Sequence, residues 1–239
     1  MRPFEPELIP QYMAEVFPYL SVTLGVTLSV IVFGSLLGGL IAWGKISGGR
    51  FARSLATAYT YVLRCTPSIV LLFLIFYGLP KFVLEVFDYD INDLSRAVFV
   101  IISFTLLYAA SSSEVMRAAY LSVNHGQYEA AVSIGLSPFT ALRRIVLPQA
   151  AVVALPNFGN SVLNLMKEGS LAYTIGLVDL LVDLLGEGNL IVSRQYGGSA
   201  LEVYIAVGLI YLGLALLITK MFLKLEQKLR PQQKNAERA

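Results

Sequence analysis

Polar side chains that could contact a substrate interrupt apolar stretches of the sequence at two places: Arg64, Thr66, Lys167, Glu168 and Ser170. A charged side chain at the centre of a membrane helix costs about 2.5–3.5 kcal/mol on insertion scales, so such a charge is interpreted first as functional. Arg64 follows Arg53 by eleven residues. At about 1.5 Å per residue, this separation sets Arg64 roughly 16 Å into a helix. We therefore expect Arg64 near mid-membrane, with the Thr66 hydroxyl close by.

The second place combines a cation, a carboxylate and a glycine. Gly169 follows Lys167 and Glu168 and allows the helix to break there. A broken membrane helix offers free backbone groups to a charged molecule, as the half-helices of transporters do. The hydroxyl of Ser170 could add a further contact.

Each of these residues also has a structural explanation. Arg64 or Lys167 could neutralise Glu114 or Glu168 between helices. Thr66-Pro67 could be a packing kink whose hydroxyl bonds to the backbone. The sequence leaves these alternatives open.

The surrounding elements are those of a membrane protein. Of 239 residues, 56% are apolar and only 14% charged, with a mean hydropathy of +0.68. A helix needs roughly 20 apolar residues to cross a bilayer. We predict an all-α polytopic membrane protein, a single domain over 1–239, with about five spans. The expected spans are 16–44, 54–80, 95–122, 148–168 and 201–223, with a loop over 124–147.

The charges of the connections predict the orientation of these spans. The first connection and the C-terminal tail are rich in lysine and arginine, whereas the second and fourth are acidic. Because positive loops stay in the cytoplasm, we expect the N-terminus outside and the C-terminus inside. The loop 124–147 then lies on the cytoplasmic side. The tail from Lys220 is expected to contact membrane lipid headgroups.

This loop reads "GQYEAAVSIGLSPFTALRRIVLPQA" over 126–150 and predicts a helical hairpin. We expect one helix over Gln127–Ile134, with Ala130 and Ala131 on its surface, and Gly135 as its left-handed stop. Ser137 is expected to cap a second helix with Pro138 at its first position. Pro148 should end that helix, because a proline disfavours helical geometry at the preceding residue. On these grounds alone, the hairpin could be an amphipathic turn resting on the inner leaflet.

The same hairpin resembles the "EAA" loop of ABC-importer permeases, through Glu129-Ala130-Ala131, Gly135 and Ile145-Val146-Leu147-Pro148. In that family the loop forms a coupling helix that docks into a cleft of the ATP-hydrolysing subunit. The resemblance implies the type I importer permease fold. It assigns coupling to the following residues: Glu129, Ala130, Ala131, Gly135, Arg143, Arg144 and Pro148.

Other segments resemble the polar amino-acid subfamily of these permeases. Arg64-Cys65-Thr66-Pro67 is similar to its second-helix signature, although Cys65 replaces a usual glycine. Lys167-Glu168-Gly169-Ser170-Leu171 is similar to a Lys-acid-small-Ser-Leu signature, with Gly169 in place of a threonine or serine. The resemblance implies that the spans carry an amino acid. Residues 176–204 look most like permeases for cystine and related sulfur-containing amino acids.

The resemblance also implies partners. No G-x-x-x-x-G-K-[ST] motif occurs in the sequence, so ATP and Mg are expected on a separate ATPase dimer. Without an internal repeat, one chain is expected to pair with a second permease, identical or homologous. An extracytoplasmic solute-binding protein would deliver the substrate, and no nucleic-acid partner is expected. The location implied is the inner membrane of a bacterium.

Two other classes of function compete with this interpretation. An ATP-independent channel would not need the hairpin. A membrane-embedded enzyme would need a nucleophile–base pair or a metal set within the spans. Single Cys65 and single His125 argue against a metal cluster and an intrachain disulfide. No cofactor is therefore expected in this chain.

Overall fold

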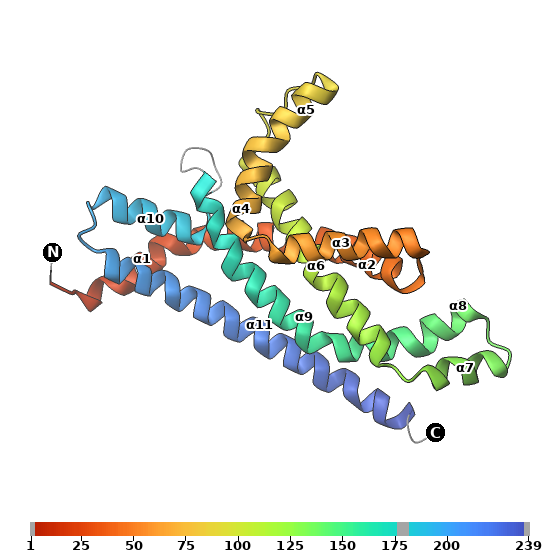
Figure 1. The fold of residues 1–239 in the computed structure, drawn as a ribbon. Helices are drawn as coiled ribbons and strands as arrows, with labels where there is room; N and C mark the ends of the chain where they lie inside the picture. Colours follow the sequence, from red (N-terminus) through yellow and green to blue (C-terminus); the bar gives the residue numbers. More distant parts are fainter. Residues whose placement is uncertain (1–2, 176–181, 237–239) are drawn as a thin grey trace.

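The computed structural model describes residues 3–175 and 182–236, and this part of the chain is helical without strands (Figure 1). The α-helices are α1 (Ile9–Val16), α2 (Leu20–Ser47), α3 (Arg50–Cys65), α4 (Ser68–Phe73), α5 (Leu79–Phe87), α6 (Arg96–Ser122), α7 (His125–Ser133), α8 (Pro138–Ala141), α9 (Leu147–Gly169), α10 (Leu184–Arg194) and α11 (Ala200–Ala236). Short 3-10 helices cover Pro6–Leu8, Phe17–Tyr19 and Ser170–Ile175, and π-helical turns cover Leu74–Gly78 and Leu142–Val146.

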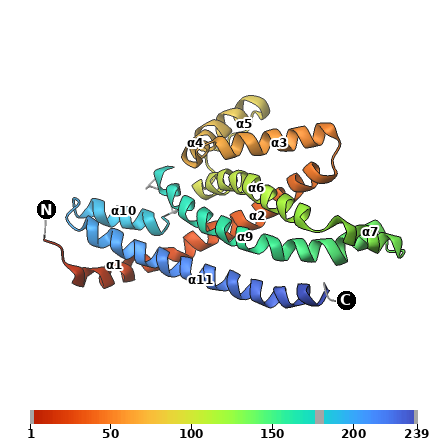
Figure 2. The same cartoon turned by 60° about the horizontal axis from the view of Figure 1, so that its bottom comes forward.

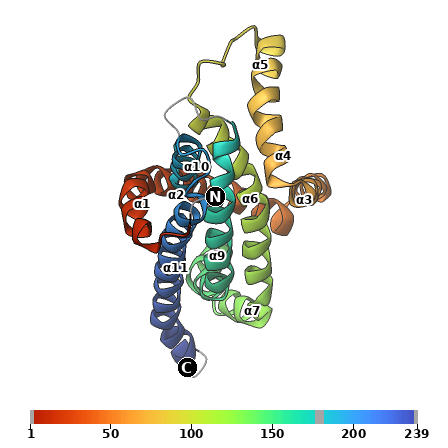
Figure 3. The same cartoon turned by 90° about the vertical axis from the view of Figure 1, so that its left-hand side faces the viewer.

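Within the described ranges, five helical stretches are long and apolar enough to cross a membrane: Pro6–Ser47, Ser68–Phe87, Arg96–Ser122, Pro138–Ile175 and Ala200–Leu229. The prediction of an all-α chain with about five spans is therefore confirmed. In Figures 2 and 3, α6 and α9 lie in the middle of the molecule. The helices α3, α4 and α5 lie on one side of them, and α1, α10 and α11 on the other.

The second span differs from the expected helix over 54–80, and that prediction is wrong. The backbone leaves the helix at Thr66, with φ −87° and ψ 125°, and Pro67 has ψ 136°. The cause is local, because Pro67 disfavours helical geometry at the residue before it. The membrane-crossing helix begins only at Ser68, and α4 leaves α3 at a large angle in Figure 1.

Pro148 has the opposite effect from the one expected. Leu147 is helical, with φ −62° and ψ −41°, so the helix that begins at Pro138 continues into α9. A π-helical turn precedes the proline, and the Leu147 N–H donates to the carbonyl of Leu142, five residues back. The wider turn rearranges the bonding around a proline that cannot donate. The prediction that the second hairpin helix ends before Pro148 is therefore wrong.

Among the described residues, the most extensive contact between two helices is that of α2 with α6, and it is made through small residues. A Cβ atom on Gly34 would lie 2.7 Å from Cδ1 of Tyr108, and one on Gly38 would overlap the Ser112 hydroxyl. The Ser112 hydroxyl instead donates to the Gly34 carbonyl, at 3.3 Å. Small residues spaced four apart allow membrane helices to approach in this way. They hold α6, which carries one wall of the site described below.

A second core joins α1, α10 and α11 at the end of the molecule opposite the α7–α8 hairpin (Figure 1). Asp183 caps α10, and its Oδ1 accepts a hydrogen bond of 2.8 Å from the Gly186 N–H. Its other oxygen has no hydrogen-bond partner among the described residues, and Asp183 is only 4% exposed. Burial raises the pKa of the Asp183 carboxyl to about 6.

We expect Gly38→Ala to destabilise the protein by about 1–3 kcal/mol, because the new methyl group overpacks the α2–α6 contact. Gly25→Ala is the matched control, since a Cβ on this glycine of α2 would meet nothing within 4 Å. Thermal unfolding in detergent, followed by size-exclusion of a fluorescent fusion, measures both variants. Equal midpoints for the two variants would contradict the close packing.

Asp183 predicts a pH dependence of stability. Its pKa in the folded chain, about 6, exceeds the ordinary 3.8. The folded state therefore binds this proton more tightly than the unfolded state, and stability falls as pH rises through 6. Between pH 5 and pH 7 we expect a loss of about 1 kcal/mol from this group. Asp183→Asn keeps the cap oxygen and removes the titration, so its melting profile should lose that part of the pH dependence. Identical pH profiles would refute the assignment.

Candidate functional site

A cavity of ≈380 Å³ lies where α3, α4, α6 and α9 meet. One wall comes from the break between α3 and α4, another from the middle of α6, and the third from the last turns of α9. Its polar lining residues are Arg64, Thr66, Ser68, Tyr108, Ser111, Ser161, Asn164 and Glu168. The helix break at Thr66 and Pro67 therefore adjoins a polar cavity within the membrane-spanning part of the chain.

Two different helices bring opposite charges to the lining of this cavity. Arg64 stands in the last turn of α3, and Glu168 stands near the end of α9. Both side chains are exposed, and no ion pair joins either of them to another of the residues that the structure describes. The guanidinium can bind a carboxylate, and the carboxylate can bind an ammonium group. The site thus has free groups of both signs.

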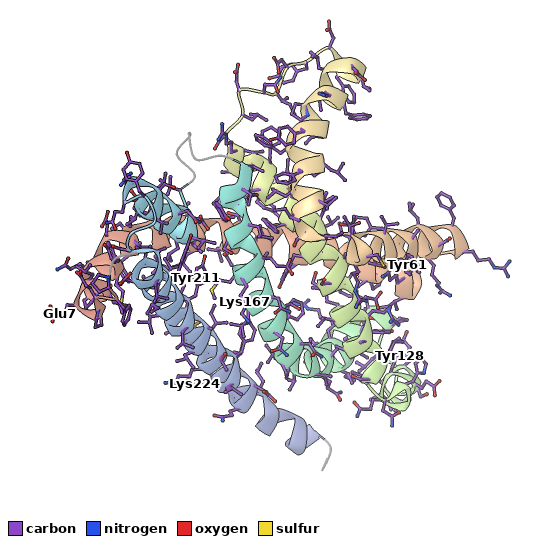
Figure 4. The ribbon with its side chains drawn as sticks, turned by 60° about the vertical axis from the view of Figure 1, so that its left-hand side comes forward. Glu7, Tyr61, Tyr128, Lys167, Tyr211 and Lys224 are labelled. Carbon is purple, nitrogen blue, oxygen red and sulfur yellow. The ribbon has the colours of Figure 1, made fainter. Side chains whose placement is uncertain are left out.

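Three of the five predicted contact residues line this cavity, and two do not. Arg64, Thr66 and Glu168 are lining residues, whereas Lys167 and Ser170 are not. Lys167, labelled on α9 in Figure 4, is next to Glu168 in a helix and so points in a different direction. The Ser170 hydroxyl donates to the Lys167 carbonyl at 2.6 Å. The Thr66 hydroxyl likewise donates to the Val62 carbonyl, at 2.8 Å, as the structural alternative supposed.

Sequence reasoning missed a polar stripe on α9 that includes Glu168. Ser161, Asn164 and Glu168 all line the cavity. They follow one another at intervals of three and four residues, which places them on one helix face. A search for polar residues at this spacing within the fourth span would have found them.

The sequence left open that Arg64 or Lys167 neutralises Glu114, and for Glu114 this alternative is wrong. Neither Arg64 nor Lys167 neutralises this carboxylate. One oxygen pairs with Lys45, and the other accepts hydrogen bonds from Arg117 at 2.7 and 3.0 Å. Lys45 is buried in the last turn of α2, although the expected first span ended at residue 44.

The predicted hairpin forms with the expected turn chemistry. Gly135 has φ +93°, which favours glycine, and its N–H donates to the Val132 carbonyl at 3.0 Å. The Leu136 N–H donates to the Ala131 carbonyl at 3.1 Å, which completes a Schellman motif. The Ser137 hydroxyl accepts from the Thr140 N–H at 3.2 Å and caps α8. Gly135 and Ser137 thus act as predicted.

The hairpin exposes both charged and apolar side chains. Glu129, Arg143 and Arg144 are exposed, and so are Ile134 at 81% and Phe139 at 70%. Ala130 lies on the surface as expected, but Ala131 is buried at 3%, so half of that prediction is wrong. The side chains of Gln127 and Gln149 form a hydrogen bond between α7 and α9. The loop is therefore fastened to the membrane helix that carries Glu168.

Residues 31–231 match the family described as binding-protein-dependent transport system inner membrane component. The chain belongs to this family. The matched residues of this inner membrane component include the whole cavity and the whole hairpin.

Two relatives of this chain are named as permeases for amino-acid compounds. The chain is 35% identical over 232 residues to the L-cystine transport system permease protein TcyL of Bacillus subtilis (strain 168), and the alignment covers 97% of this chain and 94% of TcyL. It is 35% identical over 227 residues to the nopaline transport system permease protein NocM of Agrobacterium fabrum, covering 92% of each. The chain is thus a multi-pass inner-membrane transport permease rather than an enzyme.

A solved structure shares this fold over nearly the whole permease. The crystal structure of an amino acid ABC transporter with histidines contains a chain that aligns with a TM-score of 0.79 at 28% identity. The alignment covers 95% of this permease and 99% of that chain.

Proposed function

We propose that this permease forms the translocation pathway of an ATP-driven importer for a polar amino acid. The observation that carries the proposal is the cavity that both Arg64 and Glu168 line. An amino acid has a carboxylate and an ammonium group a few ångströms apart, and these two charges match the two free side chains. Asn164 and Ser111 offer hydrogen bonds to the remaining polar groups.

The substrate class follows from the relatives and the cavity together. TcyL is named for L-cystine transport and NocM for nopaline transport. Both compounds carry amino-acid charges, so the shared chemistry is that of a zwitterion. Cystine, or a related sulfur-containing amino acid, is the first substrate to test. The segment 176–204 that favoured cystine includes residues outside the described part, and its remaining residues do not line the cavity.

The hairpin is the proposed docking site of a separate ATPase dimer that binds ATP and Mg. Glu129, Arg143 and Arg144 supply polar contacts, and Ile134 and Phe139 supply apolar ones. Ala130, Ala131, Gly135 and Pro148 complete the coupling set, Gly135 by fixing the turn. In this arrangement the hairpin and the C-terminus lie in the cytoplasm and the N-terminus lies outside.

Two further partners belong to the proposal. In one chain alone, Arg64 and Glu168 are exposed charges without an ion-pair partner among the described residues, and such charges are costly within a membrane. A second permease, identical or homologous, removes that cost by closing the pathway over them. An extracytoplasmic solute-binding protein delivers the amino acid to the open cavity.

Glu168→Gln tests the substrate site. The amide keeps the size of the side chain but loses the charge that binds the ammonium group. We expect the substrate concentration for half-maximal uptake to rise roughly ten- to hundredfold, the value of one charged hydrogen bond. ATP-driven uptake of labelled cystine and other polar amino acids into proteoliposomes, with the whole importer, measures it. Lys167→Gln is the control, because this neighbouring charge does not line the cavity. Wild-type uptake by Glu168→Gln would contradict the site.

Gly135→Arg tests the docking role. A side chain at φ +93° strains the turn, and its bulk stands on the proposed ATPase surface. We expect loss of substrate-stimulated ATP hydrolysis in a chain that still inserts and folds. Gly197→Arg introduces comparable strain, at φ +77°, in the turn between α10 and α11, and should keep the stimulation. These two helices meet at the end of the molecule opposite α7 and α8 (Figure 1). Stimulation that survives in Gly135→Arg would leave the hairpin as a lipid-surface turn.

A further inference from the structure

Lys45 is a buried cation outside the cavity. Its side chain is only 4% exposed, at the end of α2. The ammonium group donates a hydrogen bond of 2.7 Å to the Thr60 hydroxyl of α3 and forms an ion pair with Glu114 of α6. One side chain thus joins three helices.

Stability alone is a poor explanation for this cluster. Taking charges out of water is expensive, and an apolar replacement of a buried ion pair is often neutral or stabilising. Arg117 uses the second oxygen of Glu114, so both oxygens of the carboxylate have cationic partners. A satisfied network of this kind fixes one arrangement of the elements that it joins.

Of the three helices that this network joins, α3 depends most on it for its position. Within α3, all of which the structure describes, Thr60 alone is buried. Other polar contacts of α3 are the Tyr59 hydroxyl, which donates to the Leu106 carbonyl at 2.8 Å, and the Arg53 Nε, which donates to the Lys45 carbonyl at 3.1 Å. Lys45 therefore holds α3 twice, through its side chain and through its backbone.

Two members of this cluster, Thr60 on α3 and Glu114 on α6, each lie about one helical turn from a residue that lines the cavity. Thr60 precedes Arg64 by four residues, or about 6 Å along α3. Glu114 follows the lining residue Ser111 by three residues on α6, on the same face. Beyond Glu114, α6 runs to Ser122, and α7 of the hairpin begins at His125. The cluster therefore stands between the hairpin and the cavity.

We propose that Lys45 is a positioning residue, which holds Thr60 beside Glu114 and so fixes the place of Arg64 at the cavity wall. The proposal rests on the proposed function in one respect, namely that Arg64 contacts the substrate.

Cys65 provides a direct readout of the position of α3. It is the single cysteine of the chain, it is exposed, and it is the neighbour of Arg64. A nitroxide attached to it, in the complete importer with cysteine-free partner subunits, reports the mobility of the end of α3. Uptake is measured in parallel on unlabelled complexes, as half-saturating concentration and as maximal rate.

Thr60→Val removes the hydroxyl with little change of volume, and Lys45→Met removes the ammonium group. We expect a more mobile Cys65 spectrum in both variants and a roughly tenfold higher half-saturating concentration, the effect of one charged hydrogen bond. The maximal rate at saturating substrate should stay within about twofold, because the groups that touch the substrate are unchanged.

Two variants serve as matched controls. Thr60→Ser keeps the hydroxyl and should restore both readouts. Thr57→Val removes a hydroxyl three residues, or about one helical turn, away on α3. Among the described residues this hydroxyl bonds only to the Arg53 carbonyl of its own helix, at 2.7 Å, so the variant should behave as wild type.

An unchanged Cys65 spectrum in Thr60→Val would overturn the proposal, and so would a mobile spectrum with an unaltered half-saturating concentration. The same change in Thr57→Val as in Thr60→Val would also overturn it, because the effect would then belong to α3 in general. Failure of the wild-type importer to take up any amino acid would instead refute the proposed function. In that case the Cys65 spectra still decide whether Lys45 holds α3.

Discussion

Backbone polar groups within a bilayer must find partners inside the protein, and this constraint governs where the chain departs from a helix. The long helices α2 and α6 meet it with their own hydrogen bonds. The chain opens at Thr66 and Pro67, beside a polar cavity that can hold water or a solute. The cavity therefore offers polar partners to the backbone groups that the break leaves without helical hydrogen bonds.

Three prolines show how tertiary structure decides between outcomes that look alike in the sequence. Pro67 separates α3 from the second span, whereas Pro80 and Pro148 each follow a π-helical turn and remain inside a helix. The restriction on the preceding residue is the same in each case. What differs is whether the preceding turn can widen into a π-helix, in which a backbone N–H donates to the carbonyl five residues before it. The sequence carries no local signal of that choice.

Local rules predicted more of this permease than long-range ones did. Hydropathy predicted the membrane class and the number of spans, and turn chemistry predicted the stop at Gly135 and the cap at Ser137. The partner of Glu114 was missed because it lies 69 residues away, at Lys45, in a segment whose charge suggested a loop. Lys167 and Glu168 were taken together because they are adjacent, although neighbours on a helix point in different directions. Which distant residues pair, and which side chains point toward the same cavity, can be known only once the packing of the helices is known.

The exposed charges of the cavity have a consequence for biogenesis. Arg64 and Glu168 have no ion-pair partners among the described residues, and unpaired charges are costly within a membrane. In the proposed assembly, a chain without its partner is therefore expected to be less stable in the membrane than one whose cavity the partner closes. The two charges proposed for substrate binding would then also favour assembly.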